Sequence, residues 1–140
     1  MLQITITADY AIRVALYLAV QDRDTPIPAM EIAHHQQIPK PYIPKILQAL
    51  ARNDILTTYL GRTGGARLNH PSHEITMLQL IEAADGPVAL NRCLSKKTLC
   101  SRDNVCPAHP FWIKMQDSFL KMLQDIKLSD FIDKQKYQKD

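Results

Sequence analysis

Three cysteines lie close together in the second half of this sequence, and a histidine follows the last of them. They are Cys93, Cys100 and Cys106, with His109 three residues further on. Thiolates and an imidazole at such spacing can bind a metal ion or an iron–sulfur cluster, and free thiols can respond to oxidants. An odd number of cysteines argues against a disulfide framework. We therefore predict a metal or redox site between residues 93 and 109.

The spacing of these residues favours a cluster over zinc. Structural zinc sites usually bring ligands in close pairs, and here only Cys106 and His109 are spaced in that way. Three thiolates with one further ligand can hold an iron–sulfur cluster, whose larger inorganic core tolerates wider spacing. His109 is one candidate for the fourth ligand. Asp9 is the rival, although it is also a favourable carboxylate for the first turn of a helix.

The composition is that of one globular domain. The chain has 140 residues, of which 46% are hydrophobic and 22% are charged. No stretch approaches the roughly 18 consecutive apolar residues of a membrane helix, and the N-terminus lacks the basic start and cleavage site of a secretory signal. We therefore expect a soluble, cytoplasmic protein with no membrane partner.

Positive charge is concentrated in the middle of the chain. Between residues 40 and 67 there are five basic residues and one acidic residue, a local net charge of +4: Lys40, Lys45, Arg52, Arg62 and Arg67 against Asp54. Such a surface attracts a polyanion, although a solvated helix face would carry similar charge.

The elements around this basic segment are typical of a winged helix, a mainly α fold with a small β-hairpin. Helices are predicted over residues 8–20, where Thr7 can provide the N-cap, and over residues 28–36, 41–53 and from Ser72 or Thr76 to Ala84. Two β-prone runs flank the turn Gly61-Arg62-Thr63-Gly64-Gly65 and predict a hairpin. A helix–turn–helix followed by a hairpin is built to place one helix in a major groove and a loop beside the phosphates.

The helix expected over residues 41–53 has two different faces. Its apolar residues recur at intervals of three and four and predict a buried stripe: Ile43, Ile46, Leu47 and Leu50. The opposite face presents Tyr42, Lys45, Gln48 and Arg52. Pro44 is tolerated because the first-turn amides of a helix have no intrahelical partner.

A further helix is expected from Phe111 to about Ile126. Its apolar residues form a short heptad seam: Trp112, Met115, Phe119, Met122 and Ile126. The seam could pack on its own domain, but a second copy of the chain is the better interpretation. The predicted organisation is a winged-helix domain (1–87), a cysteine-rich loop (88–110), a dimerisation helix (111–132) and a flexible tail (133–140).

Several stretches together resemble the Rrf2 family of bacterial transcription regulators. They are ITADYAIRVALYLA, YIPKILQALARNDIL, LGRTGGARL, EITMLQLIEAADGP and the three-cysteine loop, in order over about residues 1–132. The ending CPAHPFW, from Cys106 to Trp112, looks more like the IscR-type and Suf-regulator members than the NsrR type.

The resemblance implies a homodimer that binds double-stranded DNA and carries one iron–sulfur cluster per subunit. Its cluster ligands would be Cys93, Cys100 and Cys106. The fourth ligand in IscR-type members is a histidine at the position of His109, and in some NsrR-type members it is an aspartate from the partner subunit at the position of Asp9. The chain keeps both, and we favour His109 and a 2Fe–2S cluster over 4Fe–4S.

We therefore expect a cluster-dependent transcription regulator that senses iron, cluster supply, redox state or nitric oxide and controls iron–sulfur assembly or stress genes. The expected DNA contacts, on a roughly palindromic operator, are Tyr42, Lys45, Gln48 and Arg52 in the major groove and Arg62 and Arg67 at the wing. The family's Arg-Gly pair at the wing is replaced here by Leu60-Gly61. No constellation of catalytic residues is present, so an enzyme is not expected. The alternatives are a metal-free thiol sensor and a zinc-stabilised adaptor.

Overall fold

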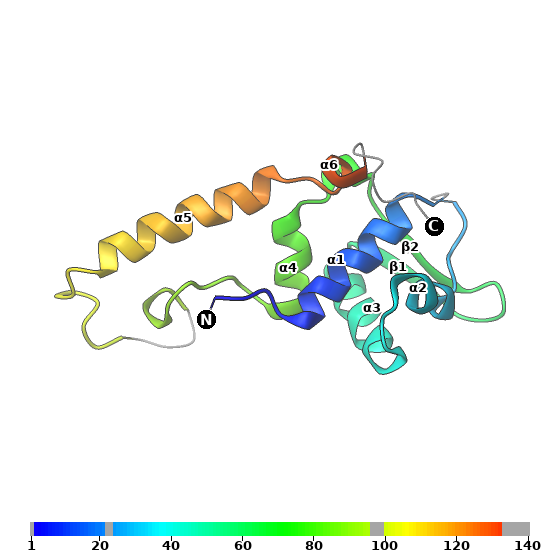
Figure 1. Cartoon of the computed structure of the whole chain (residues 1–140), viewed down its shortest axis with the longest axis horizontal. Coiled ribbons are helices and arrows are strands. Elements are labelled where there is room, and N and C mark those ends of the chain that lie inside the picture. Colours follow the sequence, from blue (N-terminus) through cyan, green and yellow to red (C-terminus); the bar gives the residue numbers. More distant parts are fainter. Residues whose placement is uncertain (1, 22–23, 96–99, 133–140) are drawn as a thin grey trace.

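Helix α1 (Ile6–Ala19) lies at the centre of the fold and packs against helices on several sides (Figure 1). The computed structural model describes residues 2–21, 24–95 and 100–132. The other helices are α2 (Ala29–Gln36), α3 (Ile43–Arg52), α4 (Met77–Asp85), α5 (His109–Asp125) and α6 (Leu128–Ile132), and strands β1 (Leu56–Tyr59) and β2 (Gly65–Leu68) form an antiparallel hairpin. Helix α5 projects from one end of the molecule, and the hairpin lies toward the other (Figure 1).

The start of α1 differs from the prediction. The N-cap is Thr5, whose side-chain oxygen accepts a hydrogen bond of 3.1 Å from the amide of Ala8, so the prediction that Thr7 caps this helix was wrong. The hydroxyl of Thr5 also donates to the carboxylate of Asp85, at the end of α4, at 2.6 Å. This contact joins residues 80 positions apart, so no local pattern could have predicted it.

Helix α3 presents its apolar stripe to the core, as predicted. Ile46 and Leu50 are fully buried, and Ile43 is 3% exposed. Lys40–Tyr42 form a single 3-10 turn ahead of α3, and Pro44 lies in the first turn of the helix. Burying an aliphatic side chain of this size contributes about 1.5–3 kcal/mol, so this stripe fixes how the helix is oriented on the domain.

The hairpin is attached to the helical domain through a third extended segment. Leu56 pairs with Leu68 and Tyr59 with Gly65 in the hairpin register. On the edge of β2 that faces away from β1, Ala66 exchanges two backbone hydrogen bonds of 2.9 Å with Ile27, just before α2. The base of the predicted wing is therefore held on both sides by backbone pairing.

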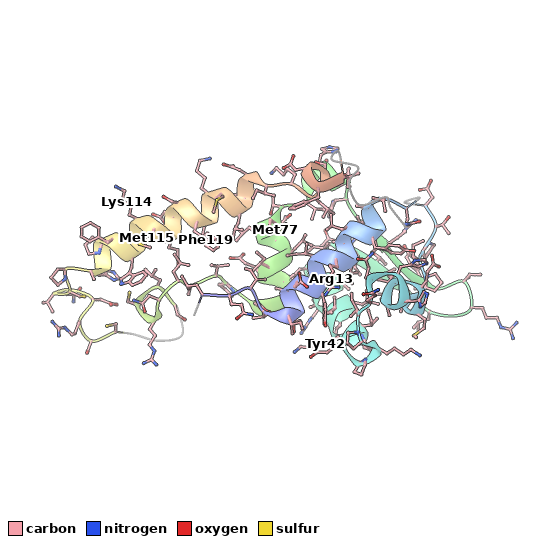
Figure 2. The ribbon with its side chains drawn as sticks, viewed as in Figure 1. Arg13, Tyr42, Met77, Lys114, Met115 and Phe119 are labelled. Atoms are coloured by element: carbon pink, nitrogen blue, oxygen red, sulfur yellow. The ribbon has the colours of Figure 1, made fainter. Side chains whose placement is uncertain are left out.

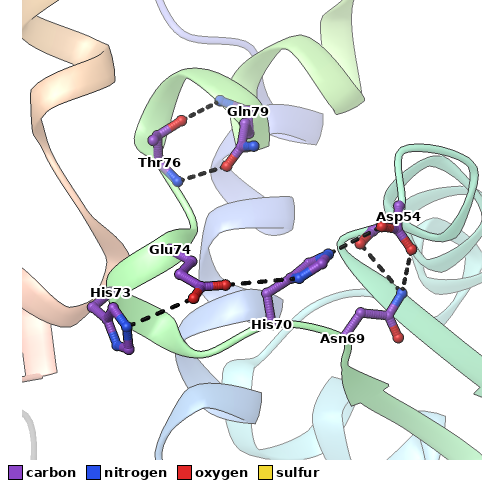
Figure 3. Close-up of polar contacts among 7 residues, drawn as sticks. All are labelled: Asp54, Asn69, His70, His73, Glu74, Thr76 and Gln79. Carbon is purple, nitrogen blue, oxygen red and sulfur yellow. Dashed lines mark hydrogen bonds and ion pairs between the residues drawn. The ribbon is translucent and has the colours of Figure 1, made fainter.

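A network of polar side chains connects the end of α3 to the segment before α4 (Figure 3). Asp54 adopts a left-handed backbone conformation, with φ of 58°, and its carboxylate contacts Asn69 at 2.9 Å and His70 at 3.0 Å. The other ring nitrogen of His70 lies 3.9 Å from Glu74. These contacts fix the return of the chain from the hairpin.

A capping box defines the start of α4, and Thr76 is its N-cap, one of the two residues predicted for this role (Figure 3). The Thr76 hydroxyl accepts from the amide of Gln79 at 3.0 Å, and the Gln79 side chain accepts from the amide of Thr76 at 2.8 Å. Gly86 ends the helix with φ of 82°, as the pattern Asp85-Gly86-Pro87 indicated.

The C-terminal segment is not one helix over residues 111–132. Helix α5 begins at His109, with Pro110 in its first turn, and ends at Asp125 because Ile126 adopts an extended conformation. The chain then pairs with the segment before α4, through Met77 N to Ile126 O at 2.9 Å and Leu128 N to Ile75 O at 2.8 Å. Leu128 is fully buried in the main core, so α6 belongs to the winged-helix body. The predicted tail 133–140 lies outside the described residues.

Candidate metal centre and nucleic-acid interface

Three side chains with metal-ligating atoms converge beside the start of α5. Cys93 lies in a short 3-10 turn (Arg92–Leu94), Asp103 lies in the turns that follow Cys100, and His109 is the first residue of α5. One donor atom from each lies within 4.8 Å of the others, and all three residues are half-buried. Of the predicted ligands, the structure thus brings Cys93 and His109 together.

Two polar atoms of this group are buried without a hydrogen-bond partner among the described residues. They are Oδ1 of Asp103 and Nδ1 of His109, which face each other at 3.7 Å, within ion-pair range but too far for a hydrogen bond. A buried polar atom left unpaired costs about 1–3 kcal/mol. Such atoms in a native site call for an explanation, and a bound ion is one.

The remaining thiols lie in the same region. Cys106 is half-buried and Cys100 is exposed, and all three cysteines are free of disulfides. Desolvation raises the pKa of the Cys93 thiol, and the negative charge of Asp103 and then of Cys100 raises it further. Cys106 adds a smaller effect of the same sign. The loop therefore carries three thiols and one imidazole, donor types that suit an iron–sulfur cluster, although only Cys93 and His109 of the four converge in the described residues.

Asp9, the rival fourth ligand, does not join this group within one protomer. It lies in the first turn of α1, and its carboxylate forms an ion pair of 3.0 Å with Arg13, one turn along the same helix. Arg13 also donates to the backbone carbonyl of Gln36 at 2.8 Å. In the described part of the chain, Asp9 therefore has a structural partner of its own.

Asp103 was missed in the sequence, although its spacing carried a signal. Cys100, Asp103, Cys106 and His109 recur every three residues. Hydrogen bonds from Asp103 N to Cys100 O and from His109 N to Cys106 O, at 3.3 and 3.2 Å, close turns of this same length. The spacing marks Asp103 as a candidate beside the cysteines and His109, and the structure brings it to Cys93 and His109 alone among them.

The exposed face of α3 carries the polar residues that were predicted there. Lys45, Gln48 and Arg52 are all exposed. Tyr42 is half-buried instead, and its ring packs edge-on against Tyr10 with centroids 5.1 Å apart. Because Tyr42 contributes to the core, only part of its side chain is accessible from outside.

The two arginines expected at the wing have different surroundings. Arg62 is exposed in the turn of the hairpin, whereas Arg67 is half-buried in β2, with its guanidinium 5.2 Å from the ring centre of Tyr59. Leu60 stands beside Arg62 and is fully exposed. The tip of the wing therefore presents one apolar and one cationic side chain.

Comparison with known proteins places this architecture in a family. The model of the Rrf2 family, described as iron-dependent transcriptional regulators, matches residues 4–134. The chain belongs to the Rrf2 family. It is 25% identical over 134 residues to the regulator IscR of Photorhabdus laumondii, covering 96% of this chain and 81% of that protein. The Rrf2 relatives are named as transcriptional regulators and not as enzymes, which agrees with the prediction.

Solved structures confirm the winged-helix fold of this Rrf2 protein. IscR of T. potens has a TM-score of 0.75 at 19% identity, covering 99% of this chain and 93% of that chain. CymR, the global cysteine regulator of B. subtilis, has a TM-score of 0.73 at 21% identity, covering 94% and 96% of the two chains. At these identities the likeness establishes the fold and leaves the cofactor undecided.

Helix α5 of the Rrf2 chain has an apolar face that the rest of the protomer covers only in part. Met115 and Met122 are each 52% exposed, while Phe119 packs against a small second core that contains Met77 and Leu123. Figure 2 shows Met115 and Phe119 on α5 and Met77 on α4. A groove of about 920 Å³ runs between α5, the end of α4 and the N-terminal segment.

No helix among the described residues is both long and apolar enough to cross a membrane.

Proposed function

We propose that this Rrf2 protein is a homodimeric regulator whose DNA binding depends on an iron–sulfur cluster. The observation that carries the proposal is the convergence of Cys93 and His109, with Cys100 and Cys106 nearby, at the start of α5. Cys93, Cys100, Cys106 and His109 would hold the cluster, with 2Fe–2S favoured over 4Fe–4S. When bound, such a cluster supplies a redox-active iron centre whose loss or oxidation can act as a signal.

The dimer would form through α5. Its half-exposed methionines and the adjoining groove offer an apolar surface for the same surface of a second copy. A two-fold dimer of this kind presents two copies of α3 to DNA. We therefore expect a roughly palindromic operator with half-sites near one helical turn apart, about 34 Å.

Helix α4 provides the physical connection between the cysteine loop and the DNA-binding face. The loop leads directly into α5, and α4 packs against both α5 and α3. Figure 1 shows the described part of the loop and the hairpin toward opposite ends of the protomer, so any effect of one on the other has to pass through the helices between them. We propose that ordering of the loop changes the tilt of α5 and thereby the spacing of the two α3 helices.

The same proposal implies which signal the protein senses and which genes it regulates. A cluster-dependent regulator would respond to iron, cluster supply, redox state or nitric oxide. Its targets would be iron–sulfur assembly or stress genes, as the family resemblance implies. The IscR name of the curated relatives supports this assignment.

Lys45→Ala is expected to weaken operator binding without changing the cluster. Lys45 is exposed on α3, where its ammonium group would contact a phosphate. Removing one phosphate contact lowers the slope of log K against log salt by about one unit. Binding titrations at several salt concentrations measure this. Lys121→Ala, on α5, is the control because it removes equal charge from an exposed helix that carries no proposed DNA contact. An unchanged slope in Lys45→Ala contradicts the assignment.

His109→Ala is expected to shift the visible spectrum of the cluster, and Asp9→Ala to leave it unchanged. His109 lies with Cys93 in the candidate site, whereas Asp9 is paired with Arg13. Replacing an imidazole ligand alters the charge-transfer bands and the reduction potential of a cluster. Anaerobic spectra of the two variants, normalised to iron content, decide between them. The reverse pattern would assign the fourth ligand to Asp9, supplied by the partner subunit.

A metal-free thiol sensor is the second candidate, because all three cysteines are unpaired and Cys100 is exposed. Thiols that react readily with oxidants have lowered pKa values. The pKa of Cys93 is raised instead, by desolvation and by Asp103, so this thiol lacks the lowered pKa that is typical of an oxidant sensor. Such a sensor would contain no iron and would gain a disulfide on treatment with peroxide.

A further inference from the structure

We infer that the cluster-free chain binds a single divalent transition-metal ion, best represented by Zn²⁺, through Cys93, Asp103 and His109. This site differs from the proposed cluster site in its ligands. It uses one thiolate, one carboxylate and one imidazole, and it leaves Cys100 and Cys106 outside. It does not depend on the cluster proposal.

The distances fit one ion. Zinc bonds of about 2.3 Å to sulfur and about 2.0 Å to nitrogen or oxygen, in tetrahedral geometry, place the N and O ligands about 3.3 Å apart and S about 3.5 Å from either. Asp103 Oδ1 and His109 Nδ1 are 3.7 Å apart, and the donor atoms of all three residues lie within 4.8 Å. Small side-chain rotations close the remaining gap.

The two buried atoms that lack a hydrogen bond also indicate a site for a single ion. Oδ1 of Asp103 and Nδ1 of His109 are both buried, yet they do not approach to hydrogen-bond distance. An ion between them would satisfy both at once. A cluster held by the three cysteines and His109 would leave the Asp103 oxygen without a role.

Binding of the ion is a simple exchange of a proton for a metal. The Cys93 thiol loses its proton to solvent as the metal–sulfur bond forms, and no electrons are transferred. Water would occupy the fourth coordination position. Because Cys93 and His109 serve both sites, the ion and the cluster exclude each other, and loss of the cluster would yield a metal-ion form rather than an empty loop.

The test is a Co²⁺ titration of the reduced, cluster-free full-length chain under anaerobic conditions, followed by displacement with Zn²⁺. We expect the d–d bands of a four-coordinate ion and a charge-transfer band from one thiolate. Cys93→Ala should lose the charge-transfer band, while Cys100→Ala and Cys106→Ala should keep it. Loss of the band in Cys106→Ala would overturn the proposed ligand set in favour of a multi-thiolate site.

Asp103→Asn tests the carboxylate ligand and is expected to raise the Kd for Co²⁺ at least tenfold. Loss of even an outer-shell partner of a metal ligand lowers metal affinity by about 10–100-fold. Asp117→Asn, an exposed position on α5, is the matched control and should bind as the parent does. Circular dichroism of both variants checks folding. Equal Kd values for Asp103→Asn and the parent would overturn the inference.

The content of iron and acid-labile sulfide in the same samples tests the cluster proposal separately. After anaerobic reconstitution, Asp103→Asn should contain as much iron and acid-labile sulfide as the parent protein. No Co²⁺ binding by a parent chain that still assembles a sulfide-containing cluster would overturn the single-ion site alone. Co²⁺ binding with no sulfide after reconstitution would support the single-ion site and contradict the cluster.

Discussion

Cys93→Ala is expected to reduce both iron and acid-labile sulfide to background after anaerobic reconstitution. Cys93 is the sulfur donor that lies with His109 in the site, and a cluster seldom survives the loss of a thiolate with no substitute nearby. Metal analysis and the visible spectrum measure the result. Ser101→Ala, an exposed position in the same loop, is the control and should retain the parent content.

The same variant should remain folded. Cys93 belongs to neither of the two hydrophobic cores, so its loss removes no core packing. The thermal unfolding of Cys93→Ala should therefore match that of the parent once the parent has been freed of both cluster and metal ions. Retention of iron and sulfide by Cys93→Ala would contradict the assignment of the site, and an unfolded product would indicate a structural metal instead.

Gly65→Ala should lower the free energy of unfolding by roughly 2–4 kcal/mol, a large effect for a change of one methyl group. Gly65 has φ of 147° at the start of β2, and an added Cβ would overlap the backbone carbonyl of Ile27. Relief of this overlap breaks the two 2.9 Å hydrogen bonds that join Ile27 to Ala66. Urea unfolding measures the loss.

Gly61→Ala provides the comparison for this prediction. Gly61 also has a positive φ, of 97°, but a Cβ there meets nothing within 4 Å. Its cost should be limited to the strain of a left-handed backbone, about 1–2 kcal/mol. If Gly65→Ala destabilises the protein no more than Gly61→Ala does, the pairing at the base of the wing is not what holds the hairpin.

Much of the fold could be predicted because its determinants are local. The spacing of Ile43, Ile46 and Leu50 predicted the buried face of α3, and the glycine-rich turn predicted the hairpin. The end of α4 followed from Gly86. In each case residues within one or two turns of one another decide the structure.

The elements that were predicted wrongly depend on distant contacts. Thr5 replaces Thr7 as the cap of α1 because its hydroxyl also reaches Asp85. The helix predicted from Phe111 to about Ile126 ends near that point, but the residues after it, assigned to the same dimerisation helix, form α6 instead because the backbone pairs with Ile75 and Leu128 enters the core. The spacing of hydrophobic residues identifies the buried face of a helix. It does not show where the helix ends so that the chain can pair with, or pack against, residues that are distant in sequence.

The candidate sites divide in the same way. Cys93 and His109 were found from residue type and spacing, whereas Asp103 emerges only when the turns bring it to them. On the face proposed to bind DNA, Lys45, Gln48 and Arg52 are exposed as expected, but the ring of Tyr42 packs in part against Tyr10. Aromatic partners far away in sequence thus decide how much of a predicted contact residue is available.

The most direct test of the central claim is the content of iron and acid-labile sulfide per chain in anaerobically purified protein, together with its visible spectrum. We expect near-stoichiometric iron and sulfide with charge-transfer bands from thiolate-bound iron. Absence of both iron and sulfide, even after anaerobic reconstitution, would contradict it. The cysteine loop would then be a thiol sensor or a site for a single metal ion, and the winged helix would regulate transcription without a cluster.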